Sequence, residues 1–245
     1  MEPKKHFLKI KHFLVSYFKK ANKKVAVVGL SGGLDSSVTV ALCVHALGAQ
    51  RVLAVLLPSS STPPQDMQDA KMLAKMLSVQ TVSVSIDPIL EKFESLSLSK
   101  LEKANLSARI RMALLYLFAQ KQNGLVVGTS DKSELMLGYF TKYGDGAADL
   151  LPIARLYKSE VKALGKFLQI PQNILSKPPS PQLWKGQTAQ NELGFSYEEA
   201  DAVLMEIEKK ASKHALYRRF GKKLVDLILE RMRQNRHKLL LPPSP

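Results

Sequence analysis

The chain has 245 residues, 45% of them hydrophobic, and a formal net charge of +15. This length suffices for one large α/β domain, and no apolar stretch approaches the roughly 20 residues of a membrane-spanning helix. The single cysteine, Cys43, excludes an intramolecular disulfide and a multi-cysteine zinc site.

The first 20 residues predict a helix. Apolar residues recur there at helical spacing among lysines and histidines, without the continuous apolar core of a signal peptide. We expect this N-terminal helix, residues 1–20, to pack on the core or on a partner subunit. We also expect a single domain over residues 1–245, a cytoplasmic location and no membrane partner.

Strand-like and helix-like segments alternate in the first half of the chain. This alternation predicts a parallel twisted sheet with helices on both faces, a Rossmann-like α/β fold in which ligands bind beyond the carboxyl ends of the strands. Extra helices complete the C-terminal part, and residues 240–245 are expected to be unstructured. The expected strands are 24–28, 51–57, 80–86 and 124–128, and the expected helices lie near 35–48, 64–77, 105–122, 157–169, 196–211 and 221–235.

A glycine-rich turn follows the first strand. Residues 29–37 read Gly-Leu-Ser-Gly-Gly-Leu-Asp-Ser-Ser, and the helix that begins after Gly32 and Gly33 offers unpaired N–H groups to an anion. The pattern lacks the Gly-Lys-Ser/Thr of a Walker A loop and the spacing of a Gly-x-Gly-x-x-Gly motif. It predicts a phosphate-binding turn in which serine hydroxyls hold phosphate oxygens and Asp35 holds Mg²⁺.

A second carboxylate is expected at the same edge of the sheet. Thr129 and Glu134 come just after the apolar strand at 125–128, as Asp35 comes just after the first strand. Two carboxylates that meet there could share one Mg²⁺, which prefers oxygen ligands and commonly bridges phosphates.

The helix near 105–122 carries two arginines, Arg109 and Arg111. Because residues two apart on a helix point in different directions, one is expected to bind a ligand while the other pairs on the surface. The expected buried face of this helix consists of Leu106, Ile110, Ala113, Leu114 and Leu117.

The charge of +15 raises the question of a polyanionic partner. Basic residues are spread along the chain, with a denser run at 208–238, but no aromatic pattern typical of single-strand binding interleaves them. We therefore expect no nucleic-acid partner.

Five spaced motifs, together with the turn at 29–37, carry a resemblance to a known family. The turn is similar to the pyrophosphate-binding loop of the N-type ATP pyrophosphatases. The further motifs resemble those of one branch of that group, the ammonia-dependent NAD synthetases. They are residues 105–112, 128–134, 141–149 and 183–188 and the pair His237-Lys238.

The resemblance implies a ligase that forms a C–N bond in NAD biosynthesis. The implied reaction is the ATP-dependent amidation of deamido-NAD to NAD with free ammonia, through an adenylated intermediate, with release of AMP and pyrophosphate. The expected partners are therefore ATP, deamido-NAD and ammonia, the expected cofactor is Mg²⁺, and the expected assembly is a homodimer. Because glutamine-dependent relatives use a catalytic cysteine in an added domain, the lone Cys43 favours free ammonia as the nitrogen donor.

The resemblance also implies residue roles. The implied ATP-binding residues are Gly29, Leu30, Ser31, Gly32, Gly33, Leu34, Asp35, Ser36, Thr129, Lys158 and Ser180. Those for deamido-NAD are Arg109, Lys142, Asp149, His237 and Lys238. The implied catalytic residues are Asp35, Glu134, Lys158 and Asp145, with Asp35 and Glu134 as metal ligands and Asp145 as an acceptor for ammonium.

The sequence departs from the family pattern at two places, and two alternative functions are considered. Pro181-Gln182 stands where the family usually has Ala-Asp, and Ala189-Gln190 stands where it has two acidic residues, which leaves the contacts of this loop open. One alternative is a member of the same group that modifies tRNA or amidates another nucleotide, which the motif at 141–149 disfavours. The other is a basic nucleic-acid-binding protein with an inactive nucleotide fold, which the presence of both Asp35 and Glu134 disfavours.

Overall fold

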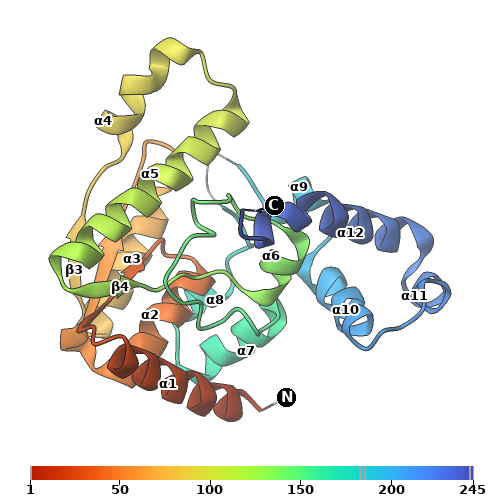
Figure 1. The fold of residues 1–245 in the computed structure, drawn as a ribbon, viewed down its shortest axis with the longest axis horizontal. Helices are drawn as coiled ribbons and strands as arrows, with labels where there is room; N and C mark the ends of the chain where they lie inside the picture. Colours follow the sequence, from red (N-terminus) through yellow and green to blue (C-terminus); the bar gives the residue numbers. More distant parts are fainter. Residues whose placement is uncertain (1, 182–183, 185, 243, 245) are drawn as a thin grey trace.

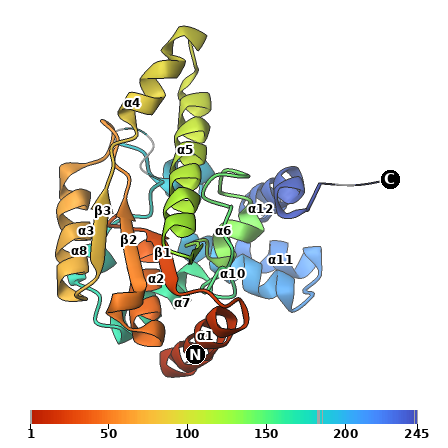
Figure 2. The ribbon, with the colours of Figure 1, turned by 60° about the vertical axis from the view of Figure 1, so that its left-hand side comes forward.

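A computed structural model describes residues 2–181, 184, 186–242 and 244 and contains the expected parallel sheet. Its four strands lie in the order β3-β2-β1-β4, and each neighbouring pair is parallel; β1, β2 and β3 lie side by side in Figure 2. The strands are β1 (Val25–Gly29), β2 (Val52–Leu56), β3 (Gln80–Ser83) and β4 (Gly124–Val126). This sheet confirms the predicted fold class.

Helices fill most of the remaining chain (Figure 1). The α-helices are α1 (Pro3–Lys20), α2 (Leu34–Leu47), α3 (Pro64–Met76), α4 (Asp87–Leu90), α5 (Lys100–Lys121), α6 (Lys132–Leu137), α7 (Lys158–Phe167), α8 (Gln172–Leu175), α9 (Ala189–Leu193), α10 (Tyr197–Glu208), α11 (Lys213–Phe220) and α12 (Lys222–Asn235). Short 3₁₀ helices are η1 (Ala49–Arg51), η2 (Glu91–Leu96) and η3 (Arg236–Leu239).

The central strands β1 and β2 bury both of their faces, whereas the edge strand β3 is largely exposed. Because side chains alternate along a strand, Ala26 and Val28 of β1 pack with α1, α2, α3, α7 and α8, whereas Val27 packs on the other side with α4 and α5. Strands covered on both sides are expected to be almost wholly apolar, as in the sequence of β1 and β2.

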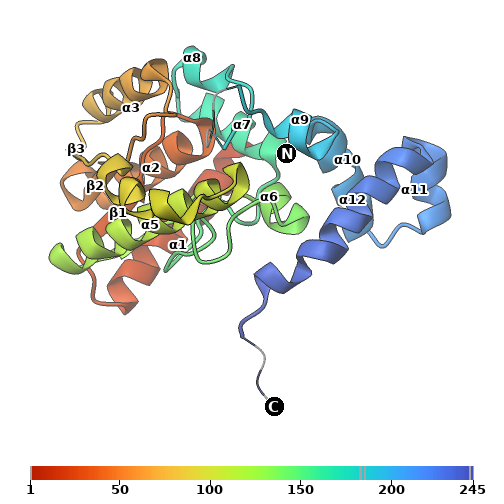
Figure 3. The ribbon, with the colours of Figure 1, turned by 90° about the horizontal axis from the view of Figure 1, so that it is seen from above.

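A separate apolar cluster holds the C-terminal helices together. It includes Leu137 of α6, Tyr157, and buried residues of α9, α10, α11 and α12. In Figure 1 helices α9 to α12, coloured light to dark blue, extend to one side of the sheet, and Figure 3 shows α11 and α12 far from β3. The cluster therefore lies next to the sheet and forms a wall beside its carboxyl edge.

The structure corrects two details. A helix at Lys213–Phe220 was not expected; Gly221, at φ +83°, separates it from α12. The predicted burial of Ala113 and Leu117 is wrong, because α5 faces the sheet through residues such as Ile110 and Ala119 and leaves those two outside. Leu117 is 44% exposed.

Some predictions concern segments at the margin of the described structure. Residues 240–242 belong to no helix or strand, whereas 243 and 245 of the predicted tail lie outside the described residues. Gln182 and residues 183 and 185 of the predicted motif at 183–188 also lie outside them. No helix in the described part of the chain is long and apolar enough to cross a membrane.

The turn after β1 is held in place by a close backbone contact. Gly32 has φ +82°, and a Cβ atom built on it would lie 2.2 Å from the carbonyl oxygen of Asp66 at the start of α3. Only glycine fits both the backbone conformation and the space. The turn at the carboxyl edge is therefore fixed by the neighbouring helix.

We expect Gly32→Ala to lower the free energy of unfolding, measured by urea denaturation, by roughly 2–4 kcal/mol, because it adds a clash to left-handed strain. Gly221→Ala is the matched control: Gly221 has a similar φ of +83°, but nothing lies within 4 Å of its Cβ position. Equal losses in the two variants would show that the contact with Asp66 is unimportant.

Candidate active site

A pocket of about 520 Å³ opens at the carboxyl edge of the sheet. The ends of β1, β2 and β4 form its floor, α5 one wall, and the segment 138–147 with α12 and η3 another. The turn residues Ser31 and Ser36 line it together with Thr129 and Ser180. The predicted phosphate-binding turn, strand-end threonine and loop serine thus meet in one cavity.

Serine hydroxyls organise the turn before any ligand binds. The Ser36 hydroxyl accepts a hydrogen bond from the Ser31 N–H at 3.2 Å and lies 3.0 Å from the Ser31 hydroxyl. The Ser37 hydroxyl donates to the Gly33 carbonyl at 2.6 Å and is fully buried, so its role is to shape the turn. Ser31 is exposed and remains accessible to an anion.

A buried ammonium group joins the predicted catalytic residues. Lys158 Nζ, at the start of α7, lies 2.8 Å from Asp35 Oδ2, 2.8 Å from Glu134 Oε1 and 2.9 Å from Asp131 Oδ2. The Lys158 side chain is only 7% exposed. The structure therefore brings together three of the four predicted catalytic residues and adds Asp131 to them.

The charges in this cluster shift one another's pKa values. Burial alone would lower the pKa of Lys158, but Asp131, Asp35 and Glu134 outweigh that effect and raise it. Burial raises the pKa of Asp131 to about 6 and the pKa of Glu134 well above its usual value, although Lys158 opposes both shifts. Lys158 thus stays charged and holds the carboxylates in place.

Sequence reasoning missed Asp131, although a local signal marks it. Asp131 caps α6: its Oδ1 accepts from the Glu134 N–H at 2.8 Å, and Glu134 Oε2 accepts from the Asp131 N–H at 3.2 Å. An acidic residue three positions before a glutamate, just ahead of a helix, is typical of this capping arrangement. The cap fixes both carboxylates relative to Lys158.

Residues of α10 contact the elements that carry the Lys158 cluster. Asp201 is 3% exposed; it accepts from the Ser133 hydroxyl and, at 2.8 Å, from the Ser159 N–H. The Ser133 hydroxyl in turn accepts from the Lys158 N–H at 3.0 Å. The Tyr197 ring lies 4.9 Å from the Lys158 ammonium. The C-terminal helices therefore fix the position of Lys158.

A second buried ion cluster ties the 177–194 loop to the phosphate-binding turn. Lys177 Nζ donates to the Gly32 carbonyl at 2.9 Å and forms ion pairs with Asp66 and Asp69. Asp69 also accepts from the Asn173 amide at 2.7 Å. Because Lys177 lies three residues before Ser180, this cluster holds the base of the loop against the turn.

The side of the pocket opposite the sheet contains Asp145. Its Oδ1 accepts from the Thr141 N–H at 2.8 Å, and the surrounding protein displaces enough water to raise its pKa. Asp145 is exposed within the pocket, where Arg111 also lies; the Arg111 Nε donates to the Leu57 carbonyl at 3.0 Å.

The C-terminal segment is fastened across this side. Lys142 Nζ donates to the carbonyls of His237 at 2.7 Å and Leu240 at 3.0 Å. Lys238 Nζ donates to those of Gly138 at 2.8 Å and Phe140 at 3.0 Å. Of the predicted substrate residues here, Lys238 lines the pocket, whereas Lys142 and His237 hold the segment in place.

Two other predicted substrate residues lie outside the pocket. Arg109 is on the exposed face of α5, and it is Arg111 that lines the cavity. Asp149 is exposed near α1: its Oδ2 accepts from the Val126 N–H at 2.7 Å, and its backbone carbonyl accepts from the Tyr17 hydroxyl at 3.4 Å. The structure therefore does not bring these two to the Lys158 cluster.

The cluster alone does not form a closed metal cage. Within the described ranges, no three His, Cys, Asp or Glu side chains are arranged to hold a metal ion. Asp35 Oδ1, however, is buried and has no hydrogen-bond partner among the described residues. A metal at this place would need oxygens from a ligand or water to complete its coordination.

Comparison with known proteins is consistent across sequence and structure. Residues 6–242 match the family model described as NAD synthase. The NH₃-dependent NAD⁺ synthetases of Methanocaldococcus jannaschii and Methanosarcina acetivorans are 42% and 44% identical, over 97% of this chain and 95% and 96% of theirs. Two solved structures cover the whole chain: an NMN synthetase from Francisella tularensis (TM-score 0.91, 38% identity, 99% of that chain) and an NH₃-dependent NAD synthetase from Campylobacter jejuni (TM-score 0.86, 34% identity, 100% of that chain).

We expect Lys158→Met to lower the free energy of unfolding by about 3–5 kcal/mol in urea denaturation, because it leaves buried carboxylates without their counter-ion. Lys162→Met, on the exposed face of the same helix, should change it by no more than about 0.5 kcal/mol. Similar small effects in both variants would contradict the view that the buried ammonium organises the site.

Proposed function

This chain belongs to the NAD synthase family, and we propose that the pocket at the carboxyl edge of its sheet is the site of its reaction. The enzyme is a ligase that amidates deamido-NAD to NAD with ammonia and ATP, through an adenylated intermediate, and releases AMP and pyrophosphate. The observation that carries the assignment is that the Lys158 cluster adjoins the serine turn: Asp35, one of its three carboxylates, lies in the same turn segment as Ser31 and Ser36, whose side of the turn lines the pocket.

The turn at one side of the pocket is suited to the phosphates of ATP. Backbone N–H groups and the Ser31 and Ser36 hydroxyls of the predicted ATP-binding segment 29–36 lie at the N-terminus of α2, which favours negative charge. Lys158 brings a positive charge to the same edge, and Thr129 and Ser180 line the cavity. We assign ATP to this side.

The donor set fits a divalent cation. Asp35 and Glu134 would hold Mg²⁺ through carboxylate oxygens, and the buried, unpartnered Asp35 Oδ1 is a suitable ligand. Three carboxylates face a single ammonium, so the cluster lacks positive charge for binding an anionic nucleotide. When bound, the ion would supply that charge and neutralise phosphate oxygens.

No nucleophilic side chain is required for this chemistry. The nicotinate carboxylate of the substrate attacks the α-phosphorus of ATP and pyrophosphate leaves; ammonia then attacks the acyl carbon and AMP leaves. Asp145 lies in the same pocket, and its raised pKa suits it to accept a proton from ammonium. The main contribution of the chain is to hold two anionic nucleotides in line.

The acid substrate could be a dinucleotide or a mononucleotide. The NMN synthetase of F. tularensis is similar over the whole chain, so nicotinic acid mononucleotide is an alternative acceptor of the amide nitrogen. The two substrates share the reacting carboxylate and differ in the adenylyl part. Rates with each, measured side by side under saturating ATP and ammonium, separate the two functions.

The exposed faces of α5 and α1 favour a homodimer. Leu117 is 44% exposed, Phe13 39% and Tyr17 37%. Asp149 links the two helices, because its backbone carbonyl accepts from the Tyr17 hydroxyl and its Oδ1 accepts from the Tyr116 hydroxyl at 3.5 Å. We propose that this face, which also carries Arg109, pairs with a second copy. Arg109 and Asp149 would then contact deamido-NAD near the subunit boundary.

We expect Asp35→Asn to lower the rate of AMP and NAD formation from Mg-ATP, ammonium and deamido-NAD by at least about 100-fold, because Mg²⁺ would lose a charged carboxylate ligand beside the reacting phosphates. Lys158 keeps Asp131 and Glu134, so the circular dichroism spectrum should not change. Glu198→Gln, at an exposed position of α10, is the control. Normal turnover in Asp35→Asn would refute the assignment of this site.

We expect Leu117→Asp to convert a dimer into a monomer in light scattering coupled to gel filtration, because it places a charge in an apolar contact. Leu227→Asp is matched in exposure, at 43%, and lies on α12 away from this face. A monomeric wild type, or loss of the dimer only in Leu227→Asp, would contradict the proposed interface.

A further inference from the structure

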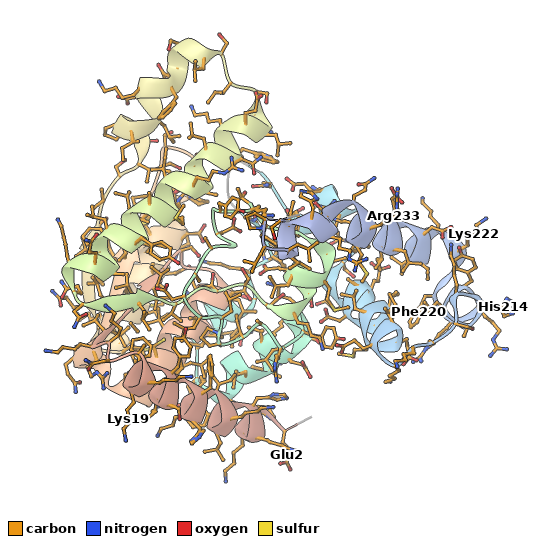
Figure 4. The ribbon with its side chains drawn as sticks, viewed as in Figure 1. Glu2, Lys19, His214, Phe220, Lys222 and Arg233 are labelled. Carbon is orange, nitrogen blue, oxygen red and sulfur yellow. The ribbon has the colours of Figure 1, made fainter. Side chains whose placement is uncertain are left out.

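Arg231, which lines the pocket, forms no ion pair within the described part of the chain. Arg231 of α12 lines the cavity, and its guanidinium carbon lies 5.2 Å from the centre of the Tyr139 ring. Its Nε is buried without a hydrogen-bond partner, and within the described residues no carboxylate forms an ion pair with it. Arg233, two residues further on, is 75% exposed and lies 2.6 Å from Glu230; Figure 4 shows it on the outer side of α12.

The acidic residues of the pocket are engaged elsewhere. Glu192 lines the cavity, but its carboxylate accepts from the Tyr139 hydroxyl at 2.7 Å and from the Gln187 amide at 2.6 Å. Asp145 accepts from the Thr141 backbone. Neither forms an ion pair with Arg231, so the guanidinium lines the cavity without a direct acidic partner among the described residues.

A second cation lies near Arg231. Lys238 also lines the pocket, and its ammonium donates to the Gly138 and Phe140 carbonyls, which neutralise no charge. Burial and the charge of Arg231 lower the pKa of Lys238 more than Asp145 raises it, which indicates that the two cations are close enough to repel. Two half-buried cations that form no ion pair are costly in a folded protein, and such costs are typical of binding sites.

We propose that Arg231, together with Lys238, binds an anionic group of the nicotinate nucleotide. The planar fork of a guanidinium suits the two oxygens of a carboxylate or a phosphate. The phosphates of ATP have their own donors at the Ser31–Ser36 turn and at Lys158, so we assign Arg231 to the acid substrate. The inference rests on the proposed function and adds a substrate-binding residue to it.

Arg231→Met tests this role, because methionine keeps an apolar chain over Tyr139 and removes the charge. Calorimetric titrations with deamido-NAD and with NAD distinguish the bound group, since NAD keeps the phosphates and lacks the carboxylate. We expect affinity for deamido-NAD to fall roughly 10- to 100-fold, as for loss of a charged hydrogen bond. A parallel fall for NAD identifies a phosphate contact, and an unchanged NAD affinity identifies the carboxylate.

The controls separate binding from structure. Affinity for ATP should stay unchanged in Arg231→Met, and Arg233→Met should bind all ligands like the wild type. Without ligand, the melting temperature of Arg231→Met should equal or exceed that of the wild type, because repulsion of Lys238 is relieved. Arg231→Gln, which is polar and uncharged, serves as a second variant and should show the same affinities and melting temperature.

Two outcomes would overturn the inference. One is a wild-type affinity for deamido-NAD in Arg231→Met. The other is a lower melting temperature in both Arg231 variants, which would assign a structural role. The wild type is assayed in parallel, so that failure of the proposed function can be told from failure of the role of Arg231. If the wild type amidates deamido-NAD while Arg231→Met binds it normally, only the role of Arg231 is refuted. A wild type that neither binds nor amidates deamido-NAD refutes the proposed function and this inference with it.

Discussion

The buried ammonium of Lys158 is the interaction on which the arrangement of the site depends. It draws the N-terminus of α2, the cap of α6 and the start of α7 to one point, although Asp35 and Lys158 are 123 positions apart in the chain. A charge that is 7% exposed is tolerated only when its partners are all present. The hydrogen bonds of Asp201 extend this requirement to α10, so the C-terminal helices and the sheet must pack together before the site exists.

The two sides of the site carry different charges. At the sheet edge, acidic groups outnumber the one ammonium, and the hydroxyls of the turn are already hydrogen-bonded to one another. At the α12 side, Arg231 and Lys238 are cationic and form no ion pair among the described residues, although Asp145 lies near enough to Lys238 to affect its pKa. An excess of one sign at each side is the pattern of a cavity whose stability is completed by ligands of the opposite sign. Such a cavity orients a molecule that carries charge along its length.

Much of this site was predictable, because it rests on local patterns. The serine and glycine turn after β1 and the position of Glu134 beyond β4 follow from strands ending at one edge, and the sheet order bears this out. Lys177, Asp201 and Arg231 were not predictable, because their partners come from segments more than 40 positions away in the chain. Arg231 also lies in the basic run 208–238, where the sequence alone suggests that a charged side chain is exposed to solvent. The exposed Leu117 was misjudged, because periodicity marks an apolar stripe and does not say what covers it.

The hydrogen bonds from Lys142 to residues 237–240 have a consequence for folding during synthesis. During translation the sheet and its flanking helices leave the ribosome first, yet one wall of the cavity consists of α12 and η3, the last helical segments of the described chain. At about 5–20 residues per second, the nascent polypeptide spends several seconds with an open, half-formed cavity. The contacts that this wall makes with a nucleotide therefore become available only after α12 and η3 have been synthesised, whereas the turn after β1 is present much earlier.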